Sequence, residues 1–278
     1  MKKLLAILVT AVLAVTACMG LTACGESKIV NPRAKTITIG YTDYEPMNYT
    51  EDGELKGFDT ELAIMTFNAL GYDVRFRLIK WENKYVDLNG GTIDCIWNGF
   101  TSNGEDDGVP RNQSVDFSYN YMQNAQCIVR KETTVAISSY AELEGKSVAF
   151  ETGSAGQALV EDNTEGINVL TRGQVSQMDA ITAVNGGTAD YAVVDILLAQ
   201  KIVTQSAYAS LVINEGLTID IEYYAIGFKK GSDLTAKVNI VLEAFGKTGY
   251  LKALAEKYGL ENSVITDFTA QKIVDILI

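Results

Sequence analysis

Residues 93–101 read IDCIWNGFT, and the interpretation of the rest of the chain starts from this stretch. It begins as an apolar run that predicts a buried strand, and it ends in Gly99 and Thr101. A strand that ends in these residues offers bare backbone and a hydroxyl group to a ligand. After the acidic, glycine-containing segment 103–108, Arg111 can bring a planar guanidinium back to the same place, where it would fit a carboxylate. The stretch therefore predicts a ligand site at the carboxyl end of a strand.

A second copy of this pattern occurs later in the chain. Residues 89–94 read NGGTID, and residues 185–190 read NGGTAD. Five residues after the Asp that ends each segment lie Gly99 and Asp195, respectively. We interpret the repeat as two similar lobes, each of which directs the end of one strand at a shared cleft.

The length and composition of the chain are those of a folded protein with two domains. It has 278 residues, of which 47% are hydrophobic and 21% are charged. The net charge of −12, from 23 basic and 35 acidic side chains, argues against nucleic-acid binding. The sequence contains no His and no cluster of Cys, which excludes a zinc site and a His-based catalytic triad. It also offers no cofactor motif.

The amino-terminal residues predict a targeting segment that is not part of the fold. Lys2 and Lys3 precede an apolar run, residues 4–17, which is too short to span a bilayer. Residues 21–24, LTAC, resemble the lipobox of bacterial lipoproteins. We therefore expect residues 1–23 to be a lipoprotein signal peptide.

The four cysteines have two different interpretations. Cys24 is expected to become the lipidated first residue of the mature chain, with Cys18 as the alternative, and residues 24–35 then form a polar tether. Cys95 and Cys127 lie in apolar, strand-like surroundings, which favours buried free thiols. A disulfide between these two stays open, because pairing cannot be placed from sequence.

The first part of the folded chain alternates between strand and helix patterns. Alternating apolar residues predict strands at 36–40 and 74–78, and apolar periodicity predicts a helix between them that ends at Gly71. A short helix from about residue 83 leads to the strand at 93–97. This β-α-β-α-β order indicates an α/β lobe with a largely parallel sheet.

The same alternation starts again at residue 138. A strand at 147–150 leads into a helix whose start has the capping spacing of Ser154 and Gln157, and the strand at 191–194 follows. Helices are expected near the carboxyl terminus at 234–248, 250–258 and 264–278. The expected domains are lobe 1 at 36–121 and 225–278, lobe 2 at 126–219, and a hinge at 122–125 and 220–224.

The ordered set of short motifs is similar to that of a known family. Residues 57–62, GFDTEL, resemble the signature of family 3 bacterial solute-binding proteins, the polar amino-acid receptors of ABC importers. Further matches fall in the family's order at 97–101, Arg111, 116–118, 143–148, 194–195 and 224–231. They cover nearly the whole mature chain, residues 36–260. The resemblance implies a type II periplasmic-binding-protein-like clamshell, with two α/β lobes joined by a two-segment hinge.

The sequence departs from the family pattern at two places. Thr66 and Phe67 replace residues that are usually small or aliphatic in the signature helix. The segment 103–110 looks longer than the family norm, so aligning Arg111 with the family's ligand arginine needs a gap.

The resemblance also implies how the cleft binds the two charges of a free amino acid. Arg111 would hold the α-carboxylate, with backbone donors at Thr101, Ser154 and Ala155. Asp195, the Gly99 carbonyl and the Thr101 hydroxyl would receive the α-ammonium group, and Asn98 belongs to the same motif. A loop arginine and a helix N-cap are the structural alternatives for Arg111 and Asp195.

The part of the site that reads the ligand side chain is less well specified. Tyr44 and Trp81 match the family's aromatic positions that enclose the ligand side chain, with core packing as the alternative for both. Glu151 follows a lobe-2 strand where the family often has a polar contact, and Glu45 lies beside Tyr44. If both glutamates face the cleft, a cationic or long polar side chain is favoured.

The first functional hypothesis is an extracytoplasmic, lipid-anchored receptor that captures a polar or charged amino acid. It would act as a monomer and deliver the ligand to an ABC permease and its ATPase. A sensor domain is the second hypothesis. A dehydratase-like enzyme with Glu45 and Glu151 as an acid/base pair is the third.

Overall fold

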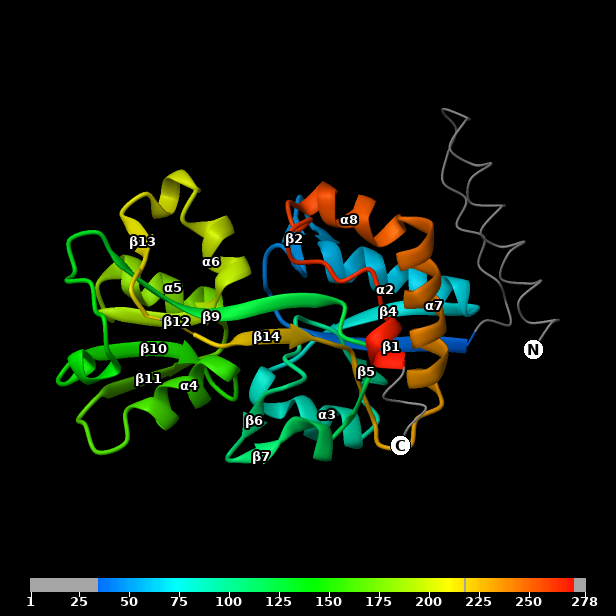
Figure 1. Ribbon diagram of the computed structural model, residues 1–278, viewed down its shortest axis with the longest axis horizontal. Coiled ribbons are helices and arrows are strands. Elements are labelled where there is room, and N and C mark those ends of the chain that lie inside the picture. The colour runs from blue at the N-terminus through cyan, green and yellow to red at the C-terminus, as the bar shows by residue number, and fades with distance from the viewer. Residues whose placement is uncertain (1–34, 218, 273–278) are drawn as a thin grey trace.

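The computed structural model describes residues 35–217 and 219–272, which form two α/β lobes side by side (Figure 1). Each lobe is built around its own sheet, with strand order β4-β1-β5-β15-β8 in lobe 1 and β11-β10-β12-β9-β13 in lobe 2. The fold is the two-lobed type II clamshell that the sequence predicts. The predicted signal peptide, Cys18 and Cys24 lie outside the described residues.

The sheet of lobe 1 is parallel at its centre. β1 pairs in parallel with β4 on one side and with β5 on the other, and β15 and β8 add antiparallel strands. The strands are β1 (Lys35–Tyr41), β4 (Tyr72–Leu78), β5 (Cys95–Ile96), β8 (Asp116–Phe117) and β15 (Gly227–Phe228). The helices are α2 (Phe58–Ala69), α3 (Lys84–Asn89), α7 (Leu234–Thr248) and α8 (Tyr250–Tyr258). Small hairpins are formed by β2 (Tyr49–Glu51) with β3 (Glu54–Lys56), and by β6 (Glu105–Asp106) with β7 (Val109–Pro110).

The sheet of lobe 2 combines parallel and antiparallel pairs. β10 lies between the parallel strands β11 and β12, and β9 pairs antiparallel with β12 and β13. The strands are β9 (Met122–Lys131), β10 (Ser147–Glu151), β11 (Leu170–Gln174), β12 (Tyr191–Asp195) and β13 (Leu211–Ile213). The helices are α4 (Ala155–Asn163), α5 (Gln177–Gly186) and α6 (Ile196–Ile202). Single 3-10 turns occur at Trp81–Asn83, Arg111–Gln113, Tyr140–Leu143 and Ser206–Tyr208.

Local sequence explains where these elements begin and what they bury. Every residue of β12 is buried, as expected for a short apolar strand inside a sheet that is covered on both faces. The side chain of Ser154 accepts a hydrogen bond from the Gln157 amide, so it caps α4 as predicted. Helix α7 carries an apolar stripe that faces the core of lobe 1: Val238, Val241, Leu242 and Phe245.

The long strand β9 and the short strand β14 (Ile221–Tyr224) run side by side between the lobes (Figure 1). β14 pairs antiparallel with the first part of β9, with Tyr224 opposite Met122 and Ile221 opposite Ala125. β9 then continues into the lobe-2 sheet, while the chain after β14 returns to lobe 1 through β15. The lobes are therefore joined by a two-stranded ribbon.

The prediction of a helix at residues 264–278 is wrong for its first turn. Val264 forms a bridge with Met122, and the amide of Ile265 donates to the Tyr121 carbonyl at 2.8 Å. Phe268 is buried and stacks on Tyr119, with ring centroids 5.6 Å apart. Backbone pairing with the strand beside it thus holds residues 264–268 outside a helix. Residues 269–272 are helical, and the rest of the predicted helix lies outside the described residues.

The structure also settles the state of two cysteines and the extent of the strand after residue 93. Cys95 and Cys127 are buried free thiols, and burial raises the pKa of both, with a smaller contribution from a nearby aspartate. The strand that the sequence places at 93–97 is paired only at Cys95–Ile96. Among residues 35–217 and 219–272, no helix is both long enough and apolar enough to cross a bilayer.

Candidate functional site

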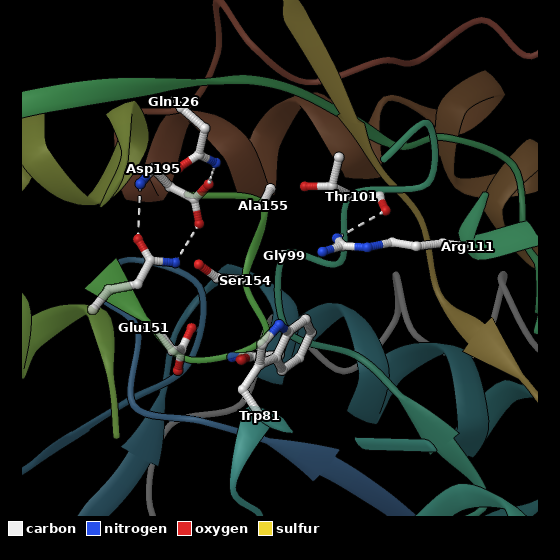
Figure 2. Close-up of a pocket in the computed structure, with 11 residues that line it drawn as sticks. Trp81, Gly99, Thr101, Arg111, Gln126, Glu151, Ser154, Ala155 and Asp195 are labelled. Atoms are coloured by element: carbon white, nitrogen blue, oxygen red, sulfur yellow. Dashed lines mark hydrogen bonds between the residues drawn. The ribbon is translucent and has the colours of Figure 1, made fainter. Parts of the chain in front are cut away.

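A cavity lies where the two lobes meet, and side chains from both lobes line it (Figure 2). The lining residues are Trp81, Asn98, Gly99, Thr101, Arg111, Gln126, Glu151, Ser154, Ala155, Gln177 and Asp195. Nine of the ten ligand-binding residues expected from the sequence are in this set. Gln126 and Gln177 are additional, and Tyr44 is not among the lining residues.

The lobe-1 wall is the loop that follows β5, and a buried asparagine fixes it. The Asn98 amide group donates to the Thr42 carbonyl at 2.9 Å and to Asn48 Oδ1 at 2.8 Å. Its oxygen accepts from the amide and the hydroxyl of Thr42, at 3.0 and 2.6 Å. The side chain is therefore used within lobe 1, and its contribution to the cavity is to position the loop.

Only glycine fits at the next position of this loop. Gly99 has φ of +55°, and a Cβ there would lie 2.6 Å from the Tyr44 ring and 3.0 Å from the Tyr224 ring. Its amide donates to Asp59 Oδ2 at 2.8 Å, so the backbone group that Gly99 can offer to a ligand is its carbonyl. Tyr44 packs behind the loop, where its hydroxyl bonds that of Tyr224 at 2.7 Å.

The side chain of Asp59 stabilises this loop through hydrogen bonds. It is fully buried, and besides Gly99 it accepts a hydrogen bond from the Tyr121 hydroxyl at 2.9 Å. Burial raises the pKa of Asp59 to about 7, and the hydrogen bonds to its charged form only partly offset that effect. The motif at residues 57–62 thus provides a carboxyl group that accepts a hydrogen bond from the backbone of the candidate ligand loop.

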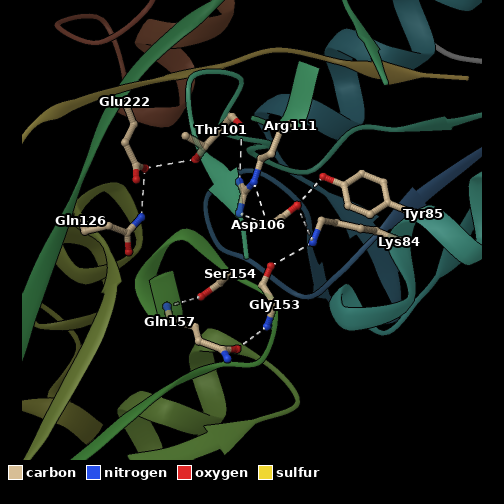
Figure 3. A network of polar contacts seen from close by, with 10 residues as sticks. All are labelled: Lys84, Tyr85, Thr101, Asp106, Arg111, Gln126, Gly153, Ser154, Gln157 and Glu222. Carbon is tan, nitrogen blue, oxygen red and sulfur yellow. Dashed lines mark hydrogen bonds and ion pairs between the residues drawn. The ribbon is translucent and has the colours of Figure 1, made fainter. Parts of the chain in front are cut away.

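Arg111 reaches the cavity from the 3-10 turn after β7 (Figures 2 and 3). Its side chain is only 1% exposed, and Nη1 donates to the Thr101 carbonyl at 3.3 Å. The Thr101 hydroxyl donates in turn to Glu222 Oε2 at 3.1 Å. Because its proton is used in that bond, the hydroxyl oxygen faces a ligand as an acceptor.

The lobe-2 wall is built around Asp195 at the end of β12 (Figure 2). Its Oδ1 accepts from the side-chain amides of Asn124 at 2.7 Å and Gln126 at 2.6 Å, and its Oδ2 accepts from Gln177 at 2.5 Å. The side chain makes no capping bond to α6, although the residue occupies the N-cap position. These amide donors fix the orientation of the carboxylate in the cavity wall, where its negative charge can attract a cationic group of a ligand.

A second carboxylate shares the same amide donors. Glu222, on β14, accepts from Asn124 at 2.9 Å and from Gln126 at 3.0 Å. Burial, and then repulsion from Asp195, raises the pKa of Glu222 to about 7. Burial also raises the pKa of Asp195, against the effect of its three amide donors. The two carboxyl groups therefore share one set of amide donors where the ribbon meets lobe 2.

The third carboxyl group at the site is Glu151, at the end of β10 (Figure 2). It is 3% exposed, and its Oε1 is buried with no hydrogen-bond partner among the described residues. Burial raises its pKa well above the ordinary value, and repulsion from Asp195 adds to that shift. A buried oxygen without a hydrogen-bond partner destabilises the folded protein unless a ligand supplies a donor.

Glu45 does not join Glu151 in the cavity. It lies 3.6 Å from the Lys201 ammonium and accepts from Gln205 at 3.1 Å, so it links a lobe-1 loop to α6 of lobe 2. A second link between the lobes runs from the Lys84 ammonium to the Gly153 carbonyl at 2.9 Å. Both links join lobe 1 to lobe 2 beside the cavity in this structure.

Comparison with known proteins identifies the family. The family model for bacterial extracellular solute-binding proteins, family 3, matches residues 37–261. The chain belongs to this family. Its members are extracellular or periplasmic proteins that bind solutes, in agreement with the resemblance seen in the sequence.

Three similar proteins illustrate the range of the family. The arginine-binding extracellular protein ArtP of Bacillus subtilis (strain 168) is 27% identical over 93% of this chain and 98% of its own length. The L-cystine-binding protein TcyJ of Escherichia coli (strain K12) is 27% identical over 80% of this chain and 82% of its own. The solved structure of an ancestral arginine-binding protein bound to arginine superposes with a TM-score of 0.74, at 29% identity, covering 80% of this chain and 97% of that one.

For this family 3 protein, sequence reasoning missed Gln126, Gln177 and Glu222. Gln126 and Glu222 lie on the two strands of the ribbon, and Gln177 is the first residue of α5. Glu222 lies in the predicted hinge segment 220–224, two residues before the matched stretch 224–231, and neither prediction assigns it a role in binding. In the described part of the chain, no group of acidic and cysteine side chains could hold a metal ion.

Proposed function

We propose that this protein captures a free amino acid with a cationic side chain, of the arginine or lysine class. The observation that carries the proposal is that Arg111, Asp195 and Glu151 line one cavity. A guanidinium and a carboxylate can bind the two charges on the α-carbon. The third group is a buried carboxyl with an unused oxygen, and a cationic side chain would satisfy it.

Each end of the ligand has a defined set of partners. The α-carboxylate would lie on Arg111, near the N-terminus of α4 at Ser154 and Ala155. The α-ammonium group would bind Asp195 and the two oxygens of the Gly99–Thr101 loop. Trp81, which is 5% exposed and packs edge-on against Phe100 at 5.2 Å, would cover the ligand's aliphatic stem.

Electrostatics favours a ligand with an overall positive charge. Glu151 and Asp195 are two buried carboxyl groups in the cavity wall, with Glu222 beside Asp195, whereas Arg111 is the cation among the lining residues. A net-neutral amino acid would leave this excess of acidic groups uncompensated, while a side-chain cation would stabilise their ionised forms. Two of the similar proteins bind arginine and one binds cystine, so we infer the cationic class from Glu151 rather than from the likeness.

Ligand entry requires the lobes to separate. The space between the lining residues is about 20 Å³, which is enough for a single water molecule and too small for an amino acid. We infer that β9 and β14 act as the hinge, with the predicted segments 122–125 and 220–224 at its centre, and that the links of Lys84 and Glu45 break on opening.

The cellular role follows from the family and from the amino-terminal segment. We infer that residues 1–23 are removed, that Cys24 carries the lipid anchor, and that residues 24–35 tether a monomeric receptor outside the cell. The ligand would then be delivered to an ABC permease and its ATPase. Membrane release of Cys24→Ala, but not of Cys18→Ala, would support this assignment of the anchor.

Isothermal titration of the mature chain tests the binding function. We expect arginine or lysine to bind at least about tenfold more tightly than glutamine, a difference of 1.4 kcal/mol. Histidine, cystine and glutamate complete the panel. A folded protein that binds none of these ligands, or that prefers glutamate, would overturn the proposal.

A further inference from the structure

The arginine of the site is held by a residue outside the cavity wall. Asp106, on the β6–β7 hairpin, places Oδ1 3.1 Å from Arg111 Nε and 2.9 Å from Nη2 (Figure 3). This hairpin lies in the segment that looks longer than the family norm, and its strand β6 also contacts α4 of lobe 2. The candidate ligand site therefore depends on a feature that the family motifs did not point to.

The hairpin and its surroundings fix the plane of the guanidinium. The Arg111 Cζ lies 5.4 Å from the centre of the Phe100 ring. A Cβ on Gly104 would lie 3.4 Å from the same Cζ, and the Arg111 amide donates to the Gly104 carbonyl at 3.0 Å. Thr101 holds Nη1 through its carbonyl, as described above. The group is thus restrained by an aromatic ring, by the backbone at Gly104 and by the Asp106 carboxylate.

A count of donors shows what this arrangement leaves for a ligand. A guanidinium has five N–H groups. Nε and one N–H of Nη2 bind Asp106, and one N–H of Nη1 binds the Thr101 carbonyl. One N–H remains on each terminal nitrogen, which is the pair that a carboxylate accepts in a bidentate contact.

Asp106 also lies beside a second buried cation. Lys84 is 3% exposed and its ammonium lies 3.6 Å from Asp106, while the Tyr85 hydroxyl donates to the same carboxylate (Figure 3). Although burial opposes it, the nearby Arg111 and Lys84 hold the pKa of Asp106 below its usual value. Asp106 therefore bonds Arg111 and also lies beside Lys84, and the free edge of Arg111 still lacks a carboxylate partner that a ligand could supply.

We propose that Asp106 is a positioning residue that orients Arg111 so that its two terminal nitrogens face the ligand carboxylate. This inference rests on the proposed binding of a cationic amino acid. In the absence of Asp106, Arg111 and Lys84 would repel each other. The edge of the guanidinium formed by Nε and Nη2 would then also be free to bind the ligand carboxylate, in competition with the edge formed by the two terminal nitrogens. Asp106 thus determines specificity for a free carboxylate without touching the ligand.

The test compares arginine with argininamide, which lacks the carboxylate, by isothermal titration. We expect the wild-type protein to bind arginine more tightly than the amide, and Asp106→Asn to reduce that preference at least about tenfold. Asp107→Asn is the matched control, because Asp107 is exposed in the turn of the same hairpin. It should leave the preference unchanged within about twofold.

Other outcomes separate the two proposals. An unchanged preference for arginine over argininamide in Asp106→Asn, including a case in which both ligands lose affinity equally, would overturn the positioning role while leaving the binding function intact. Failure of the wild-type protein to bind arginine would instead overturn the proposed function. If Asp106→Asn does not fold, Tyr85→Phe removes one restraint on Asp106 without changing any charge, and it should reduce the preference about twofold to threefold.

Discussion

Replacing Asp195 with Asn tests the acidic half of the site most directly. The two oxygens of Asp195 accept from three side-chain amides, and Gln177 also uses its own oxygen to accept from the Asp195 backbone amide at 2.8 Å. In Asp195→Asn one oxygen becomes a donor. If that donor faces Gln177, two NH₂ groups meet, and rotating the Gln177 amide only moves the conflict to the backbone.

The size of the effect follows from these contacts. Losing the charged partner of a desolvated ammonium group costs about 2–5 kcal/mol, which corresponds to about 30-fold to 5,000-fold weaker binding. In the ligand-free protein, the loss of one hydrogen bond from a side-chain amide to the charged Asp195 carboxylate lowers the free energy of unfolding by about 1.5–3 kcal/mol. Removing a buried charge beside Glu222 offsets part of that cost, because burial raises the pKa of both carboxyl groups and repulsion from Asp195 further raises that of Glu222.

The assay is isothermal titration with arginine, together with thermal unfolding of the ligand-free protein. We expect a large loss of affinity and a small decrease in melting temperature. Asp190→Asn, at the other end of the same strand, is the control, because Asp190 binds Ser147 at 2.7 and 2.8 Å and does not line the cavity. An Asp195→Asn protein that binds arginine within about threefold of wild type would refute the ammonium-binding role.

Three further predictions concern selectivity, pH and release. Glu151→Gln should weaken arginine binding about tenfold and leave glutamine binding nearly unchanged, as measured by titration, since its unpaired oxygen faces the ligand side chain; equal losses for both ligands would contradict this. The ligand-free protein should lose thermal stability as pH rises from about 4 to about 7, because the pKa values of Asp59 and Glu222 are raised and the folded state therefore binds more protons in this range than the unfolded state. Asp59→Asn should make the stability depend less on pH, and a rise in stability over this pH range would exclude the explanation. Lys84→Met removes the contact with Gly153 across the cleft and should speed ligand release about threefold to tenfold in stopped-flow experiments, whereas unchanged release would show that the contact does not stabilise the closed state.

The sequence by itself determined the two-lobed α/β architecture, and its resemblance to family 3 implied most of the candidate cavity wall. These features depend on local signals: an apolar run that ends in Gly99, a capping serine at 154, and a buried strand that ends in Asp195. Strand and helix ends are specified by short-range sterics and hydrogen bonding, and parallel strands present their carboxyl ends at one edge. Residues at such ends can therefore be placed together before the structure is known.

Only the tertiary structure decided the partners of these residues. Asp106 meets Arg111 because a hairpin folds back on itself, and Glu222 meets Thr101 across 121 positions of sequence. Tyr44 packs behind Gly99 rather than lining the cavity, and residues 264–268 pair with a neighbouring strand where local periodicity favours a helix. Such contacts depend on how distant segments pack and on how buried charges find counter-charges, and no local pattern in the chain encodes that.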